Sequence, residues 1–319
     1  MLRDVAAGFL FLNEMTGLST AEGVAPRGGA MALIRLVRPQ QWIKNFFVLA
    51  PLLFSGQATN ASAQLKAWMA FASFCLLAST VYVMNDVIDR EADRAHPTKR
   101  HRPIASGAVS TTMAYALAAT MLATSLALAF SVGMGLAACA LSYLALNVIY
   151  SIRLKHVVIL DVFAIATFFV LRLLAGSAAV QVRPSVWLIL CGGLLALYLG
   201  FAKRRHELVL LGNQSSSHRS VLSQYSTTFL DQLSVVLLAV IIVSYIMYTL
   251  ESETAKLVGG ELLSYSTVFV LYGVIRYLYL VNKRLDGNPT DTLLTDKGLL
   301  AACVMWALYC GGVVYGVIG

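Results

Sequence analysis

AWMAFASFCLLASTVYVMNDVIDREADR, residues 67–94, joins an apolar run to a cluster of acids. Residues 67–85 of this segment are strongly apolar and close to the length of about 20 residues that a helix needs to cross a bilayer. Asp86, Asp89 and Asp93 follow directly, although carboxylates are costly at membrane depth. If the helix continues, spacings of three and four residues place the three side chains on one face. The segment therefore predicts a membrane helix that ends in an acidic cluster.

The composition extends this prediction to nearly the whole chain. Hydrophobic residues make up 58% of the sequence, charged residues only 13%, and the mean hydropathy is +0.73. Soluble domains carry about 25% charged residues. The apolar runs are continuous, whereas barrel strands alternate over about ten residues, which excludes a β-barrel. We expect an all-α, multi-pass membrane bundle of about nine transmembrane helices, near residues 33–54, 67–85, 112–131, 133–151, 157–179, 185–202, 230–250, 262–281 and 299–318.

The basic residues predict the orientation of this bundle. Cytoplasmic loops of membrane proteins collect Lys and Arg. With the N-terminus on the cytoplasmic side, the outer loops hold only Lys66, Arg183 and Lys256 of the 24 Lys and Arg residues. The net charge of +8 is therefore one-sided and does not indicate nucleic-acid binding. It suits membrane lipids and an anionic substrate on the cytoplasmic side.

The cysteines and the N-terminal residues carry no predicted functional site. All five cysteines fall in apolar spans, with neither a disulfide pattern nor zinc-site spacing, so we expect them in the core. Residues 1–30 make a poor signal peptide, because their apolar run is short and their charge bias weak. We expect a disordered extension there or a wrongly assigned start, and a catalytic membrane domain at 31–319.

The acidic cluster suits a hard metal ion. Mg²⁺ commonly binds through one or two carboxylates while a phosphate-bearing substrate fills other positions. Asp86, Asp89 and Asp93 offer such oxygens, and like charges this close need a cation among them. The alternative is a solvated loop end whose acids pair with its own arginines.

Basic segments on the same side suit phosphate. His96–Gly107 reads HPTKRHRPIASG, in which two prolines stiffen a run containing Lys99, Arg100 and Arg102. Arginine can grip phosphate oxygens through two parallel hydrogen bonds. A metal ion with a cationic clamp is what a diphosphate leaving group needs. Further basic segments lie at 38–45, 150–156 and 203–207, although each could serve topology alone.

Ionisable residues also lie within the predicted spans. Asp161 and Arg172 share a helix face but stand about 16 Å apart along it, too far to pair with each other. Asp161 could bind a second metal, a substrate hydroxyl or a loop cation. For Arg172 and Arg276 we favour structural partners such as backbone carbonyls.

Taken together, these motifs resemble the UbiA superfamily of intramembrane prenyltransferases. The resemblance covers roughly residues 33–318 and includes the NDxxD pattern at 85–89 with Asp93, and Arg-Pro-Ile-Ala-Ser-Gly at 102–107. Longer stretches are most like the decaprenyl-phosphate phosphoribosyltransferase branch: RPQQWIKNFFVLAPLLF at 38–54, NDVIDREADRAHPTKRHRPIASG at 85–107, YSIRLKHVVILDVF at 150–163, and RYLYLVNKRLDGNPTDTLLTDKGLL at 276–300.

The resemblance implies an Mg²⁺-dependent transferase of the bacterial plasma membrane, active in cell-wall biogenesis. It would move 5-phosphoribose from phosphoribosyl diphosphate to a polyprenyl (decaprenyl) phosphate and release pyrophosphate. Asn85, Asp86 and Asp89 would hold the metal, and Asp93 would bind metal or ribose hydroxyls. The implied substrate-binding residues are Lys44, Asn45, Arg94, Lys99, Arg100, Arg102, Tyr150, Lys155, Asp161, Lys203 and Arg204.

One departure from the family pattern bears on the donor. Aromatic prenyltransferases of the superfamily carry a second Asp-rich motif after the sixth span, where this chain has KRRHELVLLG with Glu207 as the one acid. A second Mg²⁺ site of the usual kind is therefore in doubt. A UbiA-type transfer of a prenyl group from its diphosphate to an aromatic acceptor stays an alternative.

A non-catalytic lipid carrier or transporter is a third reading. Transporters often show repeated halves and broken helices at the midplane. This chain shows no such repeat, and its polar residues gather on the cytoplasmic side. The sequence leaves open whether copies of the chain form a homo-oligomer.

Overall fold

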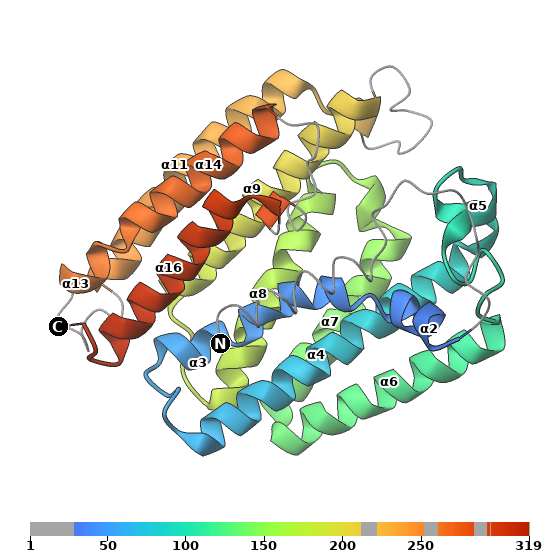
Figure 1. Ribbon diagram of the computed structural model, residues 1–319, viewed down its shortest axis with the longest axis horizontal. Helices are drawn as coiled ribbons and strands as arrows, with labels where there is room; N and C mark the ends of the chain where they lie inside the picture. Colours follow the sequence, from blue (N-terminus) through green and yellow to red (C-terminus); the bar gives the residue numbers. More distant parts are fainter. Residues whose placement is uncertain (1–28, 212–221, 252–260, 284–291, 294, 319) are drawn as a thin grey trace. The chain divides into compact units, whose positions relative to one another are not determined.

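The described part of the chain is helical and has no strand (Figure 1). The computed structural model describes residues 29–211, 222–251, 261–283, 292–293 and 295–318. Within these ranges eight helices are long and apolar enough to cross a membrane. The prediction of an all-α, multi-pass membrane protein is therefore confirmed. The eight spans are α4 (Ala61–Ile88), α6 (Thr111–Val132), α7 (Met134–Ile152), α8 (Leu160–Val180), α9 (Val186–Leu211), α11 (Thr227–Glu251), α13 (Glu261–Ser264) with α14 (Thr267–Lys283), and α16 (Lys297–Val314).

The first expected span, 33–54, is broken into three short helical pieces instead of forming one long helix. These are α2 (Ala30–Val37), η1 (Pro39–Val48) and α3 (Ala50–Phe54). Arg38 ends α2 in the left-handed conformation, with φ 56°. Pro39 follows it, and proline both lacks an N–H and disfavours a helical residue before it. This break accounts for eight long helices where nine were expected.

Two helices run further than hydropathy predicted. α4 continues to Ile88 and so contains Asn85 and Asp86, while α9 continues through the basic segment at 203–207. Lys, Arg and Glu are good helix formers, so the charged segment at 203–207 can prolong α9 beyond the apolar region. The acidic segment then turns at Asp89 and continues as α5 (Arg90–Ala95) and η2 (Lys99–His101).

The chain divides into two compact units. The first comprises Met1–Gln40 and Ala78–Ala123, and the second Gln41–Leu77 and Thr124–Gly319. Our expectation for residues 1–30 lies almost wholly outside the described residues, since the described part begins at Gly29.

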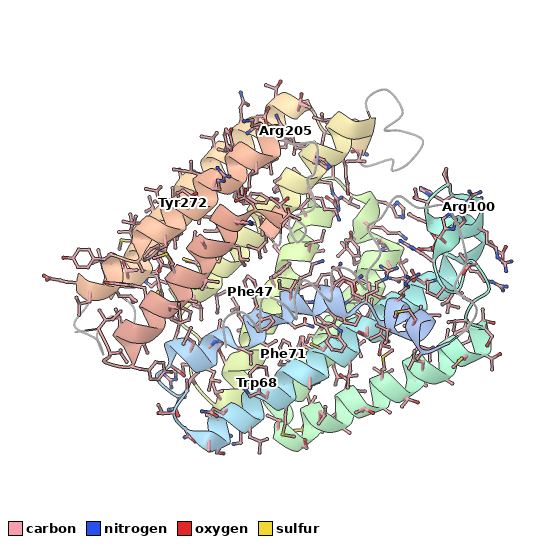
Figure 2. The ribbon with its side chains drawn as sticks, in the orientation of Figure 1. Phe47, Trp68, Phe71, Arg100, Arg205 and Tyr272 are labelled. Atoms are coloured by element: carbon pink, nitrogen blue, oxygen red, sulfur yellow. The ribbon has the colours of Figure 1, made fainter. Side chains whose placement is uncertain are left out.

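The second unit is a bundle of packed helices. α9 contacts α8 and α11, α8 contacts α7, and α14 contacts α11 and α16 (Figure 1). Gly176 lets α8 pack closely, because a Cβ there would lie only 2.0 Å from the carbonyl oxygen of Val48. Large apolar side chains such as Trp68 are exposed, as helices in lipid require, and Trp68 packs beside Phe71 (Figure 2).

Candidate active site

The first unit holds the acidic cluster, in which two carboxylates are buried against arginines. Asp86 is only 3% exposed. Both of its oxygens accept hydrogen bonds from Nη2 of Arg38, at 2.6 and 2.9 Å. Nη1 of Arg102 donates to Asp86 at 3.0 Å and to Asp93, also buried, at 2.7 Å. Arg102 therefore joins two acids that lie seven positions apart in the sequence.

Asp89 differs from the other two acids. α4 ends at Ile88, and Asp89 occupies the turn before α5, where its side chain is exposed. The three carboxylates therefore do not converge on one point as the continuous helix predicted. The alternative, in which acids pair with the segment's own arginines, describes Asp86 and Asp93 in this structure.

The donor set fits Mg²⁺ when the ion arrives with a substrate. Within the described residues, no three His, Cys, Asp or Glu side chains lie close enough together to hold a metal ion. Asn85, Asp86 and Asp89 nevertheless place three oxygen donors within about one helical turn. Mg²⁺ needs only one or two carboxylates when phosphate and water complete its shell. The cluster thus suits an ion that shares its coordination with a diphosphate.

The basic loop that follows is anchored at one end and exposed at the other. Nε of Arg94 donates to the carbonyl of Ala105 at 3.1 Å, and its Nη1 to Glu91. Lys99 and Arg100, on η2, are exposed, and Figure 2 labels Arg100. These two cations can therefore meet an anion from solution.

A second polar cluster lies in the second unit, around the buried Asp161. Nε of Arg204 donates to Asp161 at 2.8 Å, and Nη1 of Arg204 donates to Glu207 at 2.6 Å. Asp161 is 0% exposed and Arg204 2%. Both were predicted to bind substrate, but the structure commits them to each other. The lysine beside them, Lys203, keeps 47% of its side chain exposed.

Tyr225 completes this cluster and was not predicted from the sequence. Its hydroxyl donates to Asp161 at 3.1 Å and accepts from the backbone N–H of Ile159 at 2.6 Å. Ile159 has φ 71°, a strained conformation for a β-branched residue, which this bond helps to hold. Burial raises the pKa of Tyr225 to about 12, with the Ile159 bond acting against it and the Asp161 carboxylate adding to it. Tyr225 therefore stays a neutral donor at physiological pH.

The remaining predicted binding residues of the second unit are partly exposed. Nζ of Lys44, on η1, donates to Gln41 at 2.6 Å. Lys155 is half-buried on η3 (Leu154–His156). Tyr150, near the end of α7, packs edge-on against Phe168 at 6.1 Å between ring centroids.

Arg172 has the structural role that we favoured for it. Its guanidinium donates to the carbonyl of Phe168 at 2.8 Å, to Oδ1 of Asn45 at 2.7 Å and to the hydroxyl of Tyr143 at 3.1 Å. Asn45, predicted to bind substrate, is fully buried and also donates to Sγ of Cys75 at 3.3 Å. Its side chain therefore joins η1 to α8.

Arg276 is paired in the same way. Its guanidinium donates to Asp296 at 2.9 Å, and Asp296 caps α16 by accepting from the N–H of Leu299 at 2.8 Å. The arginine therefore supports a helix start, as expected of a structural residue.

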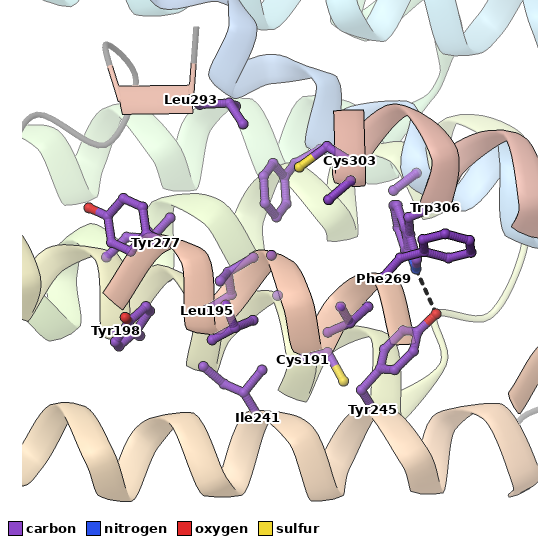
Figure 3. A pocket seen from close by; sticks show the side chains of 18 of the residues that line it. Cys191, Leu195, Tyr198, Ile241, Tyr245, Phe269, Tyr277, Leu293, Cys303 and Trp306 are labelled. Atoms are coloured by element: carbon purple, nitrogen blue, oxygen red, sulfur yellow. Dashed lines mark hydrogen bonds between the residues drawn. The ribbon is translucent and has the colours of Figure 1, made fainter. Parts of the chain in front are cut away.

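An apolar cavity of about 450 Å³ also lies in the second unit (Figure 3). Residues of η1, α3, α8, α9, α11, α14 and α16 line it. At one end Nε1 of Trp306 donates to the hydroxyl of Tyr245 at 2.6 Å. At the other, Tyr198 and Tyr277 pack edge to face with ring centroids 5.7 Å apart. Such a lining suits an apolar chain.

The two tyrosines at this end of the cavity allow a prediction about the stability of the protein. Neither Tyr198 nor Tyr277 has a hydrogen-bond partner for its buried hydroxyl among the described residues. Because a buried unpaired polar group costs about 1–3 kcal/mol, Tyr198→Phe and Tyr277→Phe should leave the melting temperature unchanged or raise it. Tyr245→Phe should lower it, since the Trp306 N–H would lose its acceptor. Thermal unfolding in detergent checks this, and a lower melting temperature for both of the first two variants would contradict it.

Comparisons with known proteins add an independent line of evidence. A family model described as the UbiA prenyltransferase family matches residues 45–295, most of the chain. The chain belongs to the UbiA prenyltransferase family. This membership confirms the resemblance drawn from the motifs, and the matched residues include both polar clusters apart from Arg38.

Relatives within the family match over nearly their full length. The chain is 32% identical over 300 residues to a decaprenyl-phosphate phosphoribosyltransferase of Mycolicibacterium smegmatis, covering 91% of this chain and 94% of that protein. It is also 32% identical over 289 residues to a decaprenyl-phosphate phosphoribosyltransferase of Corynebacterium glutamicum, covering 89% and 87%.

A solved structure agrees on the fold. A UbiA homologue from Archaeoglobus fulgidus, determined with DMAPP and Mg²⁺ bound, superposes with a TM-score of 0.66 at 20% identity. The match covers 89% of this chain and 99% of that one. At this identity the likeness shows a shared UbiA fold.

Proposed function

We propose that the chain transfers 5-phosphoribose from phosphoribosyl diphosphate to a polyprenyl phosphate and releases pyrophosphate. The observation that carries the proposal is the 32% identity to decaprenyl-phosphate phosphoribosyltransferases across nearly the whole of both chains. The acidic cluster, the exposed cations beside it and the apolar cavity each suit one part of this reaction.

The chemistry is a substitution at C1 of the ribose. An oxygen of the polyprenyl phosphate forms a bond to C1 as the bond from C1 to the pyrophosphate oxygen breaks. Because the attacking phosphate is already an anion, no general base is needed. The chain's residues then have to orient two anions and stabilise the charge that the leaving group gathers.

The first unit is assigned to the donor's diphosphate. Asn85, Asp86 and Asp89 would hold Mg²⁺, which when bound supplies Lewis-acid neutralisation of the leaving pyrophosphate. Lys99 and Arg100 are exposed and would bind the outer phosphate oxygens. Arg94 and Arg102 would add positive charge, and Asp93 would orient Arg102 through their 2.7 Å bond.

The second unit offers further cations and an apolar cavity. Lys44, Lys155, Lys203 and Tyr150 would bind substrate phosphate. Asp161, Arg204 and Asn45 would position this region from within, since their own side chains are buried and bonded to protein. The apolar cavity would take the first isoprene units of the acceptor.

Pyrophosphate release from purified protein tests the proposal. Phosphoribosyl diphosphate, Mg²⁺ and a polyprenyl phosphate together should give release that depends on all three. A prenyl diphosphate with an aromatic acceptor should give none. Release with the second pair and not the first would support aromatic prenyl transfer, and release with neither would favour a lipid carrier.

A further inference from the structure

Arg38 occupies the carboxylate that the proposed metal needs. Its Nη2 lies 2.6 and 2.9 Å from the two oxygens of Asp86, so both oxygens face a guanidinium. No site role is predicted for Arg38 from the sequence, although it opens the basic segment at 38–45. Its contact with Asp86 joins residues 48 positions apart.

Contacts of both its side chain and its backbone fix the position of Arg38. Its guanidinium lies over the ring of Tyr82 at 5.1 Å from the centroid, and Tyr82 stands one helical turn before Asp86 on α4. Its backbone is left-handed at φ 56° and its N–H donates to the carbonyl of Ile34. With 23% of its side chain exposed, Arg38 remains within reach of an incoming anion.

The charges of this cluster balance. Two buried acids, Asp86 and Asp93, meet two arginines, Arg38 and Arg102. A divalent cation added alone would leave positive charge in excess beside this buried cluster, even when the exposed carboxylate of Asp89 is counted, and such an excess is unfavourable at low local dielectric. A cation that arrives with a diphosphate brings anionic oxygens, which can receive the displaced guanidinium groups.

We propose that Arg38 is the counterion of Asp86 in the free protein and transfers to the donor's diphosphate when metal and diphosphate bind together. Metal alone then competes with Arg38 and binds weakly, whereas metal and diphosphate strengthen each other's binding. The transfer of Arg38 to the diphosphate rests on the proposed function. The competition between Arg38 and the metal for Asp86 concerns only the free protein.

Metal binding without any substrate tests the competition. The full chain in detergent is titrated with Mn²⁺, and the loss of the free-ion EPR signal gives the dissociation constant. Arg38→Gln should bind Mn²⁺ about tenfold more tightly than the unaltered protein. Arg35→Gln changes an exposed arginine on α2, the helix that Arg38 ends, and should bind Mn²⁺ like the unaltered protein. Asp86→Asn should lose the site, which locates the ion. Unchanged or weaker Mn²⁺ binding in Arg38→Gln would overturn the proposal.

The KM for the donor tests the transfer of Arg38, and here the expected effect is weaker binding. In saturating Mg²⁺, the KM for phosphoribosyl diphosphate should rise about tenfold in Arg38→Gln and stay unchanged in Arg35→Gln. A structural role alone would not tighten metal binding while weakening donor binding. If Arg38→Gln does not fold, Arg38→Lys serves, because it keeps the charge but loses the two-oxygen contact, and tighter Mn²⁺ binding is again expected. An unchanged donor KM beside tighter Mn²⁺ binding would refute the transfer.

These results separate the inference from the proposed function. The Mn²⁺ titration uses neither donor nor acceptor, so it measures the competition between Arg38 and the metal even if the protein does not transfer phosphoribose. Conversely, phosphoribosyl transfer with Mn²⁺ binding unaffected by Arg38→Gln would leave the proposed function standing and remove the inference.

Discussion

Asp86→Asn is expected to lower phosphoribosyl transfer by about a thousandfold while the protein stays folded. The substitution keeps the size of the side chain and leaves a carbonyl oxygen for Arg38 and Arg102, which lie 2.6 and 3.0 Å from Oδ1. It removes the negative charge that would hold Mg²⁺ against the leaving pyrophosphate. Initial rates of pyrophosphate release, with melting temperature measured beside them, give the answer.

A neighbouring acid provides the control. Glu91 lies on α5, is 75% exposed and pairs with Arg94 at 3.1 Å, a surface contact of small energetic value. Glu91→Gln should therefore keep a rate within about twofold of the unaltered protein. Near-normal turnover in Asp86→Asn would show that this carboxylate does not hold the metal.

The second large effect is expected on stability, at the buried pair of the second unit. Arg204→Met would leave Asp161, which is 0% exposed, facing its cluster without a cation. Breaking a buried ion pair by removing one partner costs about 3–5 kcal/mol. Chemical denaturation in detergent should show this loss. Lys203→Met, an exposed change one position away, should cost less than about 1 kcal/mol.

A double variant separates charge from packing. If the loss arises from an unpaired carboxylate, adding Asp161→Asn to Arg204→Met should recover much of the stability, because the buried charge disappears. The Tyr225 hydroxyl would still find an oxygen on the asparagine. Additive losses in the double variant would instead assign the effect to packing.

Much of the fold could be predicted because the membrane imposes it. A helix in lipid satisfies its own backbone, so apolar length alone indicated the span that became α8 (Leu160–Val180). The same principle required partners for Arg172, and the carbonyl of Phe168 is one. The prediction of one continuous span at 33–54 was wrong because hydropathy averages over Pro39 and Pro51, whose backbones interrupt a helix.

The candidate site was harder to predict because its contacts join distant positions. Tyr225 lies 64 residues from Asp161, and Asn45 lies 127 residues from Arg172. Sequence spacing reports neighbours along one helix and carries no signal for such contacts. The prediction that Asp86, Asp89 and Asp93 lie together assumed a continuous helix. The helix is interrupted by the turn at Asp89.

Labelled donor tests the central proposal most directly. Phosphoribosyl diphosphate carrying one isotope in the ribose and another in the β-phosphate is incubated with the protein, Mg²⁺ and a polyprenyl phosphate, and the lipid is then extracted. We expect the ribose label in the lipid and the β-phosphate label in released pyrophosphate, with neither product formed after chelation of the metal. A lipid fraction without ribose label, while a prenyl diphosphate yields a prenylated aromatic product, would contradict it.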